Sequence, residues 1–205
     1  MTTLPAAAPA PFLNFAPELL LRAQSIKVAF FDVDGVLTDG GVYFSEYPDG
    51  HANAAQTADF RSSGEMIKRF NTLDGHGLKM LQTAGITPVV ITGRDSSVLR
   101  ARLQALGITH SHFGTENKQP AAEQTLSALG LDWNAAAAMG DDWPDLPVMG
   151  RAAMACAPAN AHLEVRLRAH YVTRSSGGQG AVREFCDLLL VASGHYAAML
   201  RKYLA

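Results

Sequence analysis

Four short groups of polar residues in this chain carry side-chain types that could do chemistry. They are Asp32-Val33-Asp34-Gly35, Thr92-Gly93-Arg94, Lys118, and Gly140-Asp141-Asp142 with Asp145. Carboxylate oxygens can hold a hard metal ion, while hydroxyl, lysine and arginine groups can bind and neutralise an anion. Taken singly, each group also has a structural interpretation, such as a turn, a strand exit or a solvated loop. Their combination and order therefore carry more information than any one of them.

Short apolar runs precede these groups and alternate with segments of helical period. The predicted strands are Lys27–Phe31, Pro88–Ile91, His110–Phe113, Ala135–Met139, Ala152–Cys156 and Tyr171–Thr173. The predicted helices are Gly75–Ala84, Ser96–Leu106, Pro120–Leu129, Asn160–Leu167 and Ala181–Ala192. This alternation predicts an α/β fold with a doubly wound, mainly parallel sheet and helices on both faces. Because ligands bind at the carboxyl ends of such strands, we expect the four polar groups to meet in one crevice.

One stretch interrupts the alternation and divides the chain. The runs Val42–Phe44 and Met66–Ile67 flank the polar segment Ser45–Gly64, which predicts a β-hairpin with a long loop. We therefore expect an N-terminal arm and short helix at 1–25, a domain at 26–194 and a C-terminal tail at 195–205. The hairpin is an insertion at 40–71 within that domain. The arm is expected to be disordered to Phe12, with the helix at Pro17–Gln24.

Composition excludes some classes of partner. The 17 basic and 19 acidic residues leave a net charge of -2, which argues against binding a nucleic-acid backbone. No apolar run is long enough to span a membrane, and the N-terminus lacks the pattern of a signal peptide. Cys156 and Cys186 lie in apolar stretches, where buried reduced thiols are expected. These features predict a cytoplasmic protein that contacts neither nucleic acid nor membrane.

The four polar groups, in this order from Ala29 to Asp145, resemble the motifs of the haloacid dehalogenase superfamily of phosphotransferases. The resemblance implies that Asp32 is a nucleophile, since a carboxylate needs no deprotonation and its phosphate ester is labile. It implies that Asp34 protonates the leaving oxygen and then activates water. Mg²⁺ is implied as the cofactor, held by Asp32, the backbone carbonyl of Asp34, and Asp141.

The same resemblance assigns the remaining polar residues. Thr92 would hydrogen-bond the phosphoryl oxygens, and Lys118 would neutralise charge in the transition state. Asp145 is placed to orient Lys118. Asp142 is expected either behind the metal ligands or as the N-cap of the next helix.

Further motifs resemble 3-deoxy-D-manno-octulosonate 8-phosphate phosphatases, over Ile26 to about Gly194. They are Asp34-Gly-Val-Leu-Thr-Asp-Gly40, Phe70-Asn-Thr-Leu-Asp-Gly-His-Gly77, Ile91-Thr-Gly-Arg94 and Gly177-Gly-Gln-Gly-Ala-Val-Arg-Glu184. The resemblance implies a sugar-acid phosphate as substrate, a role in making the inner-core sugar of lipopolysaccharide, and a cytoplasmic homo-oligomer, a tetramer. The hairpin stands where larger members of the superfamily carry a cap domain, so neighbouring subunits would close the crevice.

Substrate-binding residues are predicted within these motifs. Arg94 offers paired donors to the substrate carboxylate. The small residues around Gly178 and Gly180 would let a loop backbone approach the sugar. The remaining predicted residues are Thr38, Asn71 and Asp74. Two departures from the family pattern are the length of Ser45–Gly64 and Gln179, which stands where many relatives carry arginine.

Other functions are compatible with parts of the pattern. A phosphatase for another sugar-acid phosphate, such as a sialic acid 9-phosphate, would share the fold and mechanism. A phosphoacceptor signalling or binding module without turnover also uses acidic residues, a threonine and a lysine. Its phosphoacceptor, however, follows a later strand and needs no acid two residues on. A silent scaffold subunit is disfavoured because every reactive position carries a competent residue.

Overall fold

The computed structural model describes residues 13–42 and 67–204 and contains a parallel sheet of six strands. The strands are β1 (Val28–Phe31), β2 (Thr87–Ile91), β3 (His110–His112), β4 (Ala136–Met139), β5 (Met154–Ala157) and β6 (Tyr171–Val172). Their order across the sheet is β3-β2-β1-β4-β5-β6. The chain builds outward from β1 in one direction and then from β4 in the other. The carboxyl ends of β1 and β4 therefore flank the switch point, where ligands bind in such sheets.

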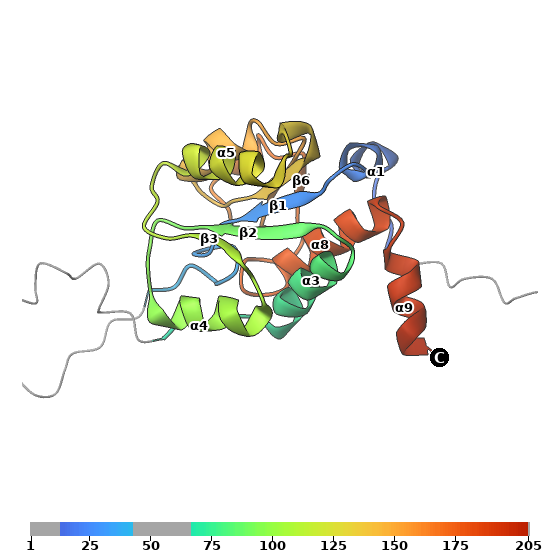
Figure 1. Cartoon of the computed structure of the whole chain (residues 1–205), viewed down its shortest axis with the longest axis horizontal. Helices are drawn as coiled ribbons and strands as arrows, with labels where there is room; N and C mark the ends of the chain where they lie inside the picture. The colour runs from blue at the N-terminus through green and yellow to red at the C-terminus, as the bar shows by residue number, and fades with distance from the viewer. Residues whose placement is uncertain (1–12, 43–66, 205) are drawn as a thin grey trace, which may run out of the picture.

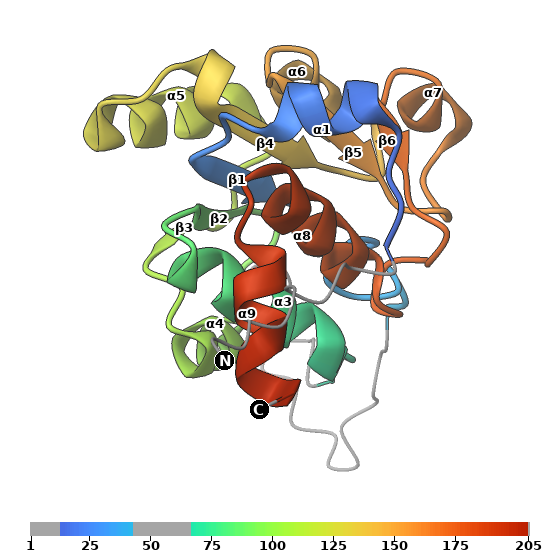
Figure 2. The same ribbon diagram turned by 90° about the vertical axis from the view of Figure 1, so that its right-hand side faces the viewer.

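Helices cover both faces of the sheet (Figures 1 and 2). On one face lie α3 (Thr72–Thr83), α4 (Ser97–Leu106) and α8 (Ala181–Ala192), and on the other lie α5 (Lys118–Leu129), α6 (Leu146–Met149) and α7 (Leu163–Arg166). The remaining helices are α1 (Pro17–Ala23), η2 (Trp133–Ala135), η3 (Trp143–Asp145) and α9 (Tyr196–Leu204). The predicted doubly wound α/β fold is confirmed.

The apolar strands serve both cores at once. In β1, Ala29 and Phe31 belong to the core under α3, α4 and α8, whereas Val28 and Phe30 belong to the core under α5, α6 and α7. Successive side chains of a strand point to opposite faces, so a strand covered on both sides must be apolar throughout. This explains why the run at Val28–Phe31 showed no alternation in sequence.

Two helices begin earlier than predicted, and both starts affect the site. Helix α3 begins at Thr72 because the Asn71 side chain accepts a hydrogen bond from the Leu73 backbone and caps the helix. Helix α5 begins at Lys118, two residues before Pro120, because proline is tolerated in the first turn of a helix. Lys118 therefore lies on the helix and not on the loop that precedes it.

The C-terminal segment is a helix where the sequence analysis expected a tail. Helix α9 spans Tyr196–Leu204 and lies beside α3 and α8 (Figure 2). Its apolar residues Tyr196, Met199, Leu200 and Tyr203 recur at helical spacing, a signal that was present in the sequence. The predicted helix at Asn160–Leu167 is shorter, at Leu163–Arg166. The predicted hairpin strands and loop fall largely on residues 43–66, and the arm on residues 1–12, which lie outside the described residues.

Candidate active site

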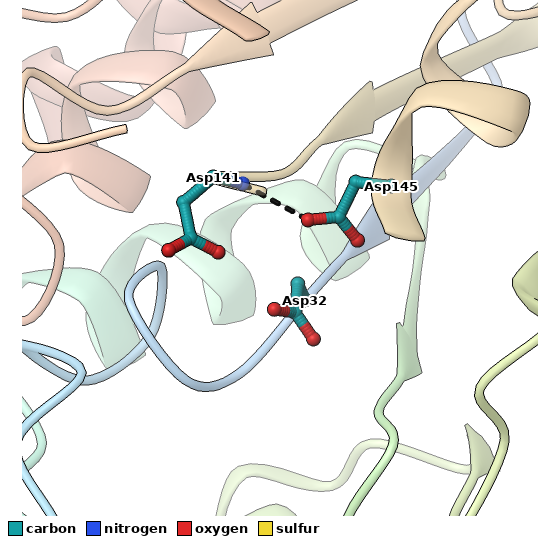
Figure 3. A group of neighbouring side chains, drawn as sticks. All are labelled: Asp32, Asp141 and Asp145. Carbon is teal, nitrogen blue, oxygen red and sulfur yellow. Dashed lines mark hydrogen bonds between the residues drawn. The ribbon is translucent and has the colours of Figure 1, made fainter. Parts of the chain in front are cut away.

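Three carboxylates meet at the switch point of the sheet (Figure 3), and one ammonium group lies against two of them. One carboxylate oxygen from each of Asp32, Asp141 and Asp145 lies within 4.8 Å of the other two. Lys118 Nζ lies 2.6 Å from Asp32 Oδ1 and 2.7 Å from Asp145 Oδ1. The sequence prediction that these residues converge from separate strand ends is confirmed by this geometry.

Local backbone structure places each of these side chains. Asp32 continues β1, its N–H donating to Met139 O on β4 at 3.1 Å. Asp145 ends η3, and its Oδ2 accepts hydrogen bonds from the backbone N–H of Asp141 at 3.0 Å and of Asp142 at 3.3 Å. Asp142 is the N-cap of η3, which was one of its two predicted roles. Because Asp145 is held by two N–H groups and Lys118, it is the most completely satisfied carboxylate of the three.

The site is electrostatically unbalanced without a cation. Burial, with a contribution from Asp145, raises the pKa of Asp32 to about 6 despite the opposing effect of Lys118. Burial and the charges of Asp32 and Asp145 raise the pKa of Asp141 to about 8. Burial alone would lower the pKa of Lys118, but the two carboxylates beside it raise it overall. Three carboxylates against one ammonium leave negative charge that a divalent cation would neutralise.

The backbone after Asp32 is shaped to approach the Asp141 carboxylate. Gly35 has φ +87°, and a Cβ built at this position would lie 2.0 Å from Asp141 Oδ2. Only glycine therefore fits here. The neighbouring carboxylate oxygens of Asp32 and Asp141 are of the type that suits a hard divalent ion. The metal-binding role of Asp32, Asp34 and Asp141 stays a prediction.

The Asp34 carboxylate faces two basic side chains, Lys68 and Arg94, instead of the carboxylate cluster. Its Oδ1 lies 2.6 Å from Lys68 Nζ, and its Oδ2 lies 3.8 Å from Arg94 Nε. The Lys68 side chain is 2% exposed and was not singled out from the sequence. Lys68 precedes the Phe70–Gly77 motif in a stretch without periodicity, so no spacing signal pointed to it. Its contact fixes the orientation of the Asp34 carboxylate.

Thr92 lies buried at the end of β2, next to Asp32 at the end of β1. The Thr92 N–H donates to His112 O at 3.0 Å, which continues the sheet ladder beyond the strand. Its Oγ1 accepts the Arg94 N–H at 3.2 Å, so the hydroxyl proton is left to donate to a further group. The Arg94 side chain is half-exposed beside Asp34.

Three predicted substrate-binding residues make contacts inside the protein. The Thr38 hydroxyl donates to Val33 O, and Asn71 Nδ2 donates to Gly178 O at 3.4 Å. The buried Asp74 carboxylate accepts the N–H groups of Gly180 and Arg183, at 3.3 and 2.8 Å. The contacts of Asn71 and Asp74 hold the loop that contains Gly178 and Gly180. The predicted substrate-binding roles of all five residues stay predictions.

Comparisons with known proteins agree with the fold. The fold is that of a haloacid dehalogenase-like hydrolase, and the family model of that description matches residues 113–185. The 3-deoxy-D-manno-octulosonate 8-phosphate phosphatase KdsC of Yersinia pestis is 39% identical over 177 residues, covering 86% of each chain. The Escherichia coli K12 enzyme of the same name matches at the same identity and coverage.

Solved structures give the same result. A probable YrbI family phosphatase from Pseudomonas syringae superposes with a TM-score of 0.83 at 43% identity, covering 93% of this chain and 99% of that one. The Moraxella catarrhalis 3-deoxy-D-manno-octulosonate 8-phosphate phosphatase, solved with magnesium, phosphate and KDO, has a TM-score of 0.80 at 32% identity. The match covers 91% of this chain and 98% of the Moraxella chain.

The chain belongs to the 3-deoxy-D-manno-octulosonate 8-phosphate phosphatase family, and it is a phosphoric monoester hydrolase. Phosphatases of the haloacid dehalogenase class use a divalent metal, and the acidic cluster provides the oxygen ligands for one. Among the described residues, no helix is both long enough and apolar enough to cross a bilayer.

Proposed function

We propose that this protein hydrolyses 3-deoxy-D-manno-octulosonate 8-phosphate to the free sugar acid and inorganic phosphate. The observation that carries the proposal is the carboxylate cluster with Lys118, in a chain 39% identical over most of its length to enzymes of that activity. The half-exposed guanidinium of Arg94 lies beside Asp34, where it could pair with the carboxylate of a sugar acid. A phosphatase for a sialic acid 9-phosphate would use the same catalytic groups and is the alternative.

In the first step an Asp32 carboxylate oxygen attacks phosphorus. The new bond joins Asp32 to the phosphoryl group, the bond to the sugar oxygen breaks, and Asp34 gives its proton to that oxygen. Lys118 lies against Asp32 and neutralises charge that develops on the phosphoryl oxygens. The Thr92 hydroxyl would donate to one of these oxygens.

In the second step Asp34 takes a proton from water, whose oxygen attacks phosphorus. The bond to Asp32 breaks, phosphate leaves, and the Asp32 carboxylate is restored. Asp145 positions Lys118 through the 2.7 Å contact and touches no reacting atom. Mg²⁺, held by Asp32, Asp141 and the Asp34 carbonyl, would lower the negative charge of the phosphoryl group and fix its orientation. The magnesium ion in the Moraxella relative supports this choice of metal.

The experiment that tests the substrate compares the two sugar-acid phosphates and p-nitrophenyl phosphate with Mg²⁺. We expect kcat/KM for 3-deoxy-D-manno-octulosonate 8-phosphate to exceed the other two by about 100-fold or more, since binding contacts separate related substrates by a few kcal/mol. A preference for the sialic acid phosphate would reject the proposed substrate and keep the mechanism. Ca²⁺ should support little activity, because its longer bonds and larger coordination number misplace the phosphoryl group.

The proposed enzyme acts in the cytoplasm, in synthesis of the lipopolysaccharide inner-core sugar, as a homotetramer. Family membership supports each of these points. The apolar side chains of Ile67 and Leu73 are more than half exposed near the start of α3, where a neighbouring subunit could cover them. Light scattering at assay concentration tests the assembly, and a fully active monomer would contradict it.

A further inference from the structure

Two backbone segments are packed directly against each other beside Asp34. One follows β1 and includes Gly35, and the other is the loop before α8 that includes Gly177 and Gly178. A Cβ built on Gly177 would lie 1.9 Å from Gly35 O, and the Gly178 N–H donates to Val36 O at 3.0 Å. The two segments are separated by about 140 residues in sequence, and their contact sets where the Gly35–Val36 peptide, directly after Asp34, lies.

One side chain from a third segment joins the two. Asn160 Nδ2 donates to Gly35 O at 3.0 Å, and Asn160 Oδ1 accepts the Gly177 N–H at 2.6 Å. A side-chain amide can donate and accept at once, whereas a carboxylate can only accept. Asn160 therefore matches the carbonyl of one segment and the N–H of the other. The sequence analysis assigned no functional role to Asn160.

The turn that carries Asn160 is itself fixed to the site. The His162 N–H donates to Asp141 O at 2.8 Å, and the Ala159 N–H donates to Ser175 O at 3.1 Å. The turn is thus tied to the backbone of a proposed metal ligand on one side and to the loop before α8 on the other. An amide mounted on this turn can hold the Gly35 carbonyl in a defined place relative to Asp141.

We propose that Asn160 is a positioning residue for the proton-transfer group Asp34. It acts through the Gly35 carbonyl, which belongs to the residue that follows Asp34 in the chain. Gly35 has φ +87° and no side chain, so the local backbone can adopt other conformations once this hydrogen bond is lost. The inference rests on the proposed function, specifically on the role of Asp34 as the acid of the first step.

The test uses the leaving group. An alkyl phosphate such as the sugar-acid phosphate needs a proton on the departing oxygen, whereas p-nitrophenolate leaves without one. We expect Asn160→Ala to lower kcat/KM for the sugar-acid phosphate at least about tenfold and that for p-nitrophenyl phosphate less than about threefold. The effect on kcat should exceed that on KM. Asn160→Asp keeps the contact with Gly177 and loses the one with Gly35, and it should show the same selective loss.

Three controls make the result decisive. Asn134→Ala removes an exposed asparagine far along the chain from these contacts and should leave both substrates unaffected. Thermal unfolding checks that each variant is folded. If Asn160→Ala does not fold, Asn160→Asp is used as the test variant in its place. Asp34→Asn is the reference and should show the same leaving-group selectivity with larger amplitude.

Equal losses on both substrates, or no loss, would overturn the assignment of Asn160. If Asp34→Asn itself showed no leaving-group selectivity, the acid role of Asp34 would be wrong and this proposal would fall with it. The failure of Asn160 alone and the failure of the proposed mechanism are therefore separate results.

Discussion

Two aspartates, the buried Asp74 and the half-buried Asp141, have opposite surroundings. Asp74 lies on α3, is 1% exposed, and accepts the N–H groups of Gly180 and Arg183 at the start of α8. The N-cap residue of α8 is Gly180, which has no side chain to accept hydrogen bonds from the first backbone N–H groups of the helix. Asp74 therefore caps α8 from another helix. Asp141 instead faces the carboxylates of Asp32 and Asp145. A carboxylate that accepts hydrogen bonds from backbone N–H groups, as Asp74 does, has a structural role. A carboxylate that lies beside other carboxylates, as Asp141 does, is available to bind a cation.

The difference also appears in acidity. Burial raises the pKa of Asp74, but backbone N–H groups of Arg183, Gly180 and Val182 oppose the rise. The pKa of Asp141 rises to about 8 because burial is reinforced by neighbouring carboxylates. The same residue type thus serves stability in one region and function in the other. Substitution of each should separate these roles.

The largest effect is expected at Asp32. Asp32→Asn removes the nucleophile, so turnover should fall at least about 1,000-fold. The melting temperature should not fall, because the substitution removes a charge that Asp145 and Asp141 oppose. Steady-state assays with Mg²⁺ and thermal unfolding measure the two quantities. Near-normal activity in a folded Asp32→Asn protein would reject the aspartyl-phosphate mechanism.

The opposite result is expected at Asp74. Asp74→Ala leaves the start of α8 without its cap and should lower the free energy of unfolding by about 2–4 kcal/mol. Asp74→Asn keeps one acceptor and should cost less than the alanine. Urea unfolding measures both. If Asp74 contacts substrate, as the sequence analysis predicted, Asp74→Asn would raise KM while stability stayed at the wild-type value.

Much of the fold and the grouping of the carboxylates could be predicted from the sequence, whereas the structural role of Asp74 could not. Strand β1 was recognisable because two-sided burial makes it continuously apolar, whereas β3, with the sequence His-Ser-His, gave a weaker signal. Gly107 and Gly130 marked helix ends where both adopt positive φ. The carboxylates of the crevice could be grouped because the ends of parallel strands meet at one edge. This inference needs only element order, and element order is visible in a sequence.

The structural contacts of Asp74 and Asn160 could not be predicted, because their partners are backbone atoms that are distant in the sequence. Asp74 accepts from residues more than 100 positions away, and Asn160 donates to Gly35 at a separation of 125. Backbone donors carry no residue-type signal, so motif membership made Asp74 a substrate-binding prediction. The 2.6 Å contact of Lys68 with Asp34 joins two side chains, but it could not be predicted either, since nothing in the sequence pairs these two residues.

A smaller effect is expected at Arg94. Arg94→Lys keeps the positive charge but loses the paired donors that fit a carboxylate. KM for the sugar-acid phosphate should rise about tenfold, which corresponds to about 1.4 kcal/mol of binding free energy. The value for p-nitrophenyl phosphate, which has no carboxylate, should change less. An equal change for both substrates would instead indicate that Arg94 acts through its neighbour Asp34.

The smallest effect is a change in the pH dependence of stability. In the metal-free protein the pKa of Asp32 is about 6 and that of Asp141 about 8, both above the ordinary 3.8. Groups whose pKa is raised by folding stabilise the protein when protonated. Their contribution is therefore lost as pH rises through these values, and the melting temperature should fall by a few degrees between pH 6 and pH 8.

Mg²⁺ should abolish this fall, because the cation replaces the protons that the carboxylates release, so its stabilising effect should be larger at pH 8 than at pH 6. His112 and His170 have pKa values lowered by burial and affect stability in the opposite sense, at and below about pH 6.5. The informative quantity is therefore the difference in the pH dependence of the melting temperature between wild type and Asp141→Asn, which lacks one titrating carboxylate. That variant should show a flatter metal-free profile and little response to Mg²⁺. An unchanged profile would mean that Asp141 is already neutralised within the protein, as Asp74 is by the start of α8.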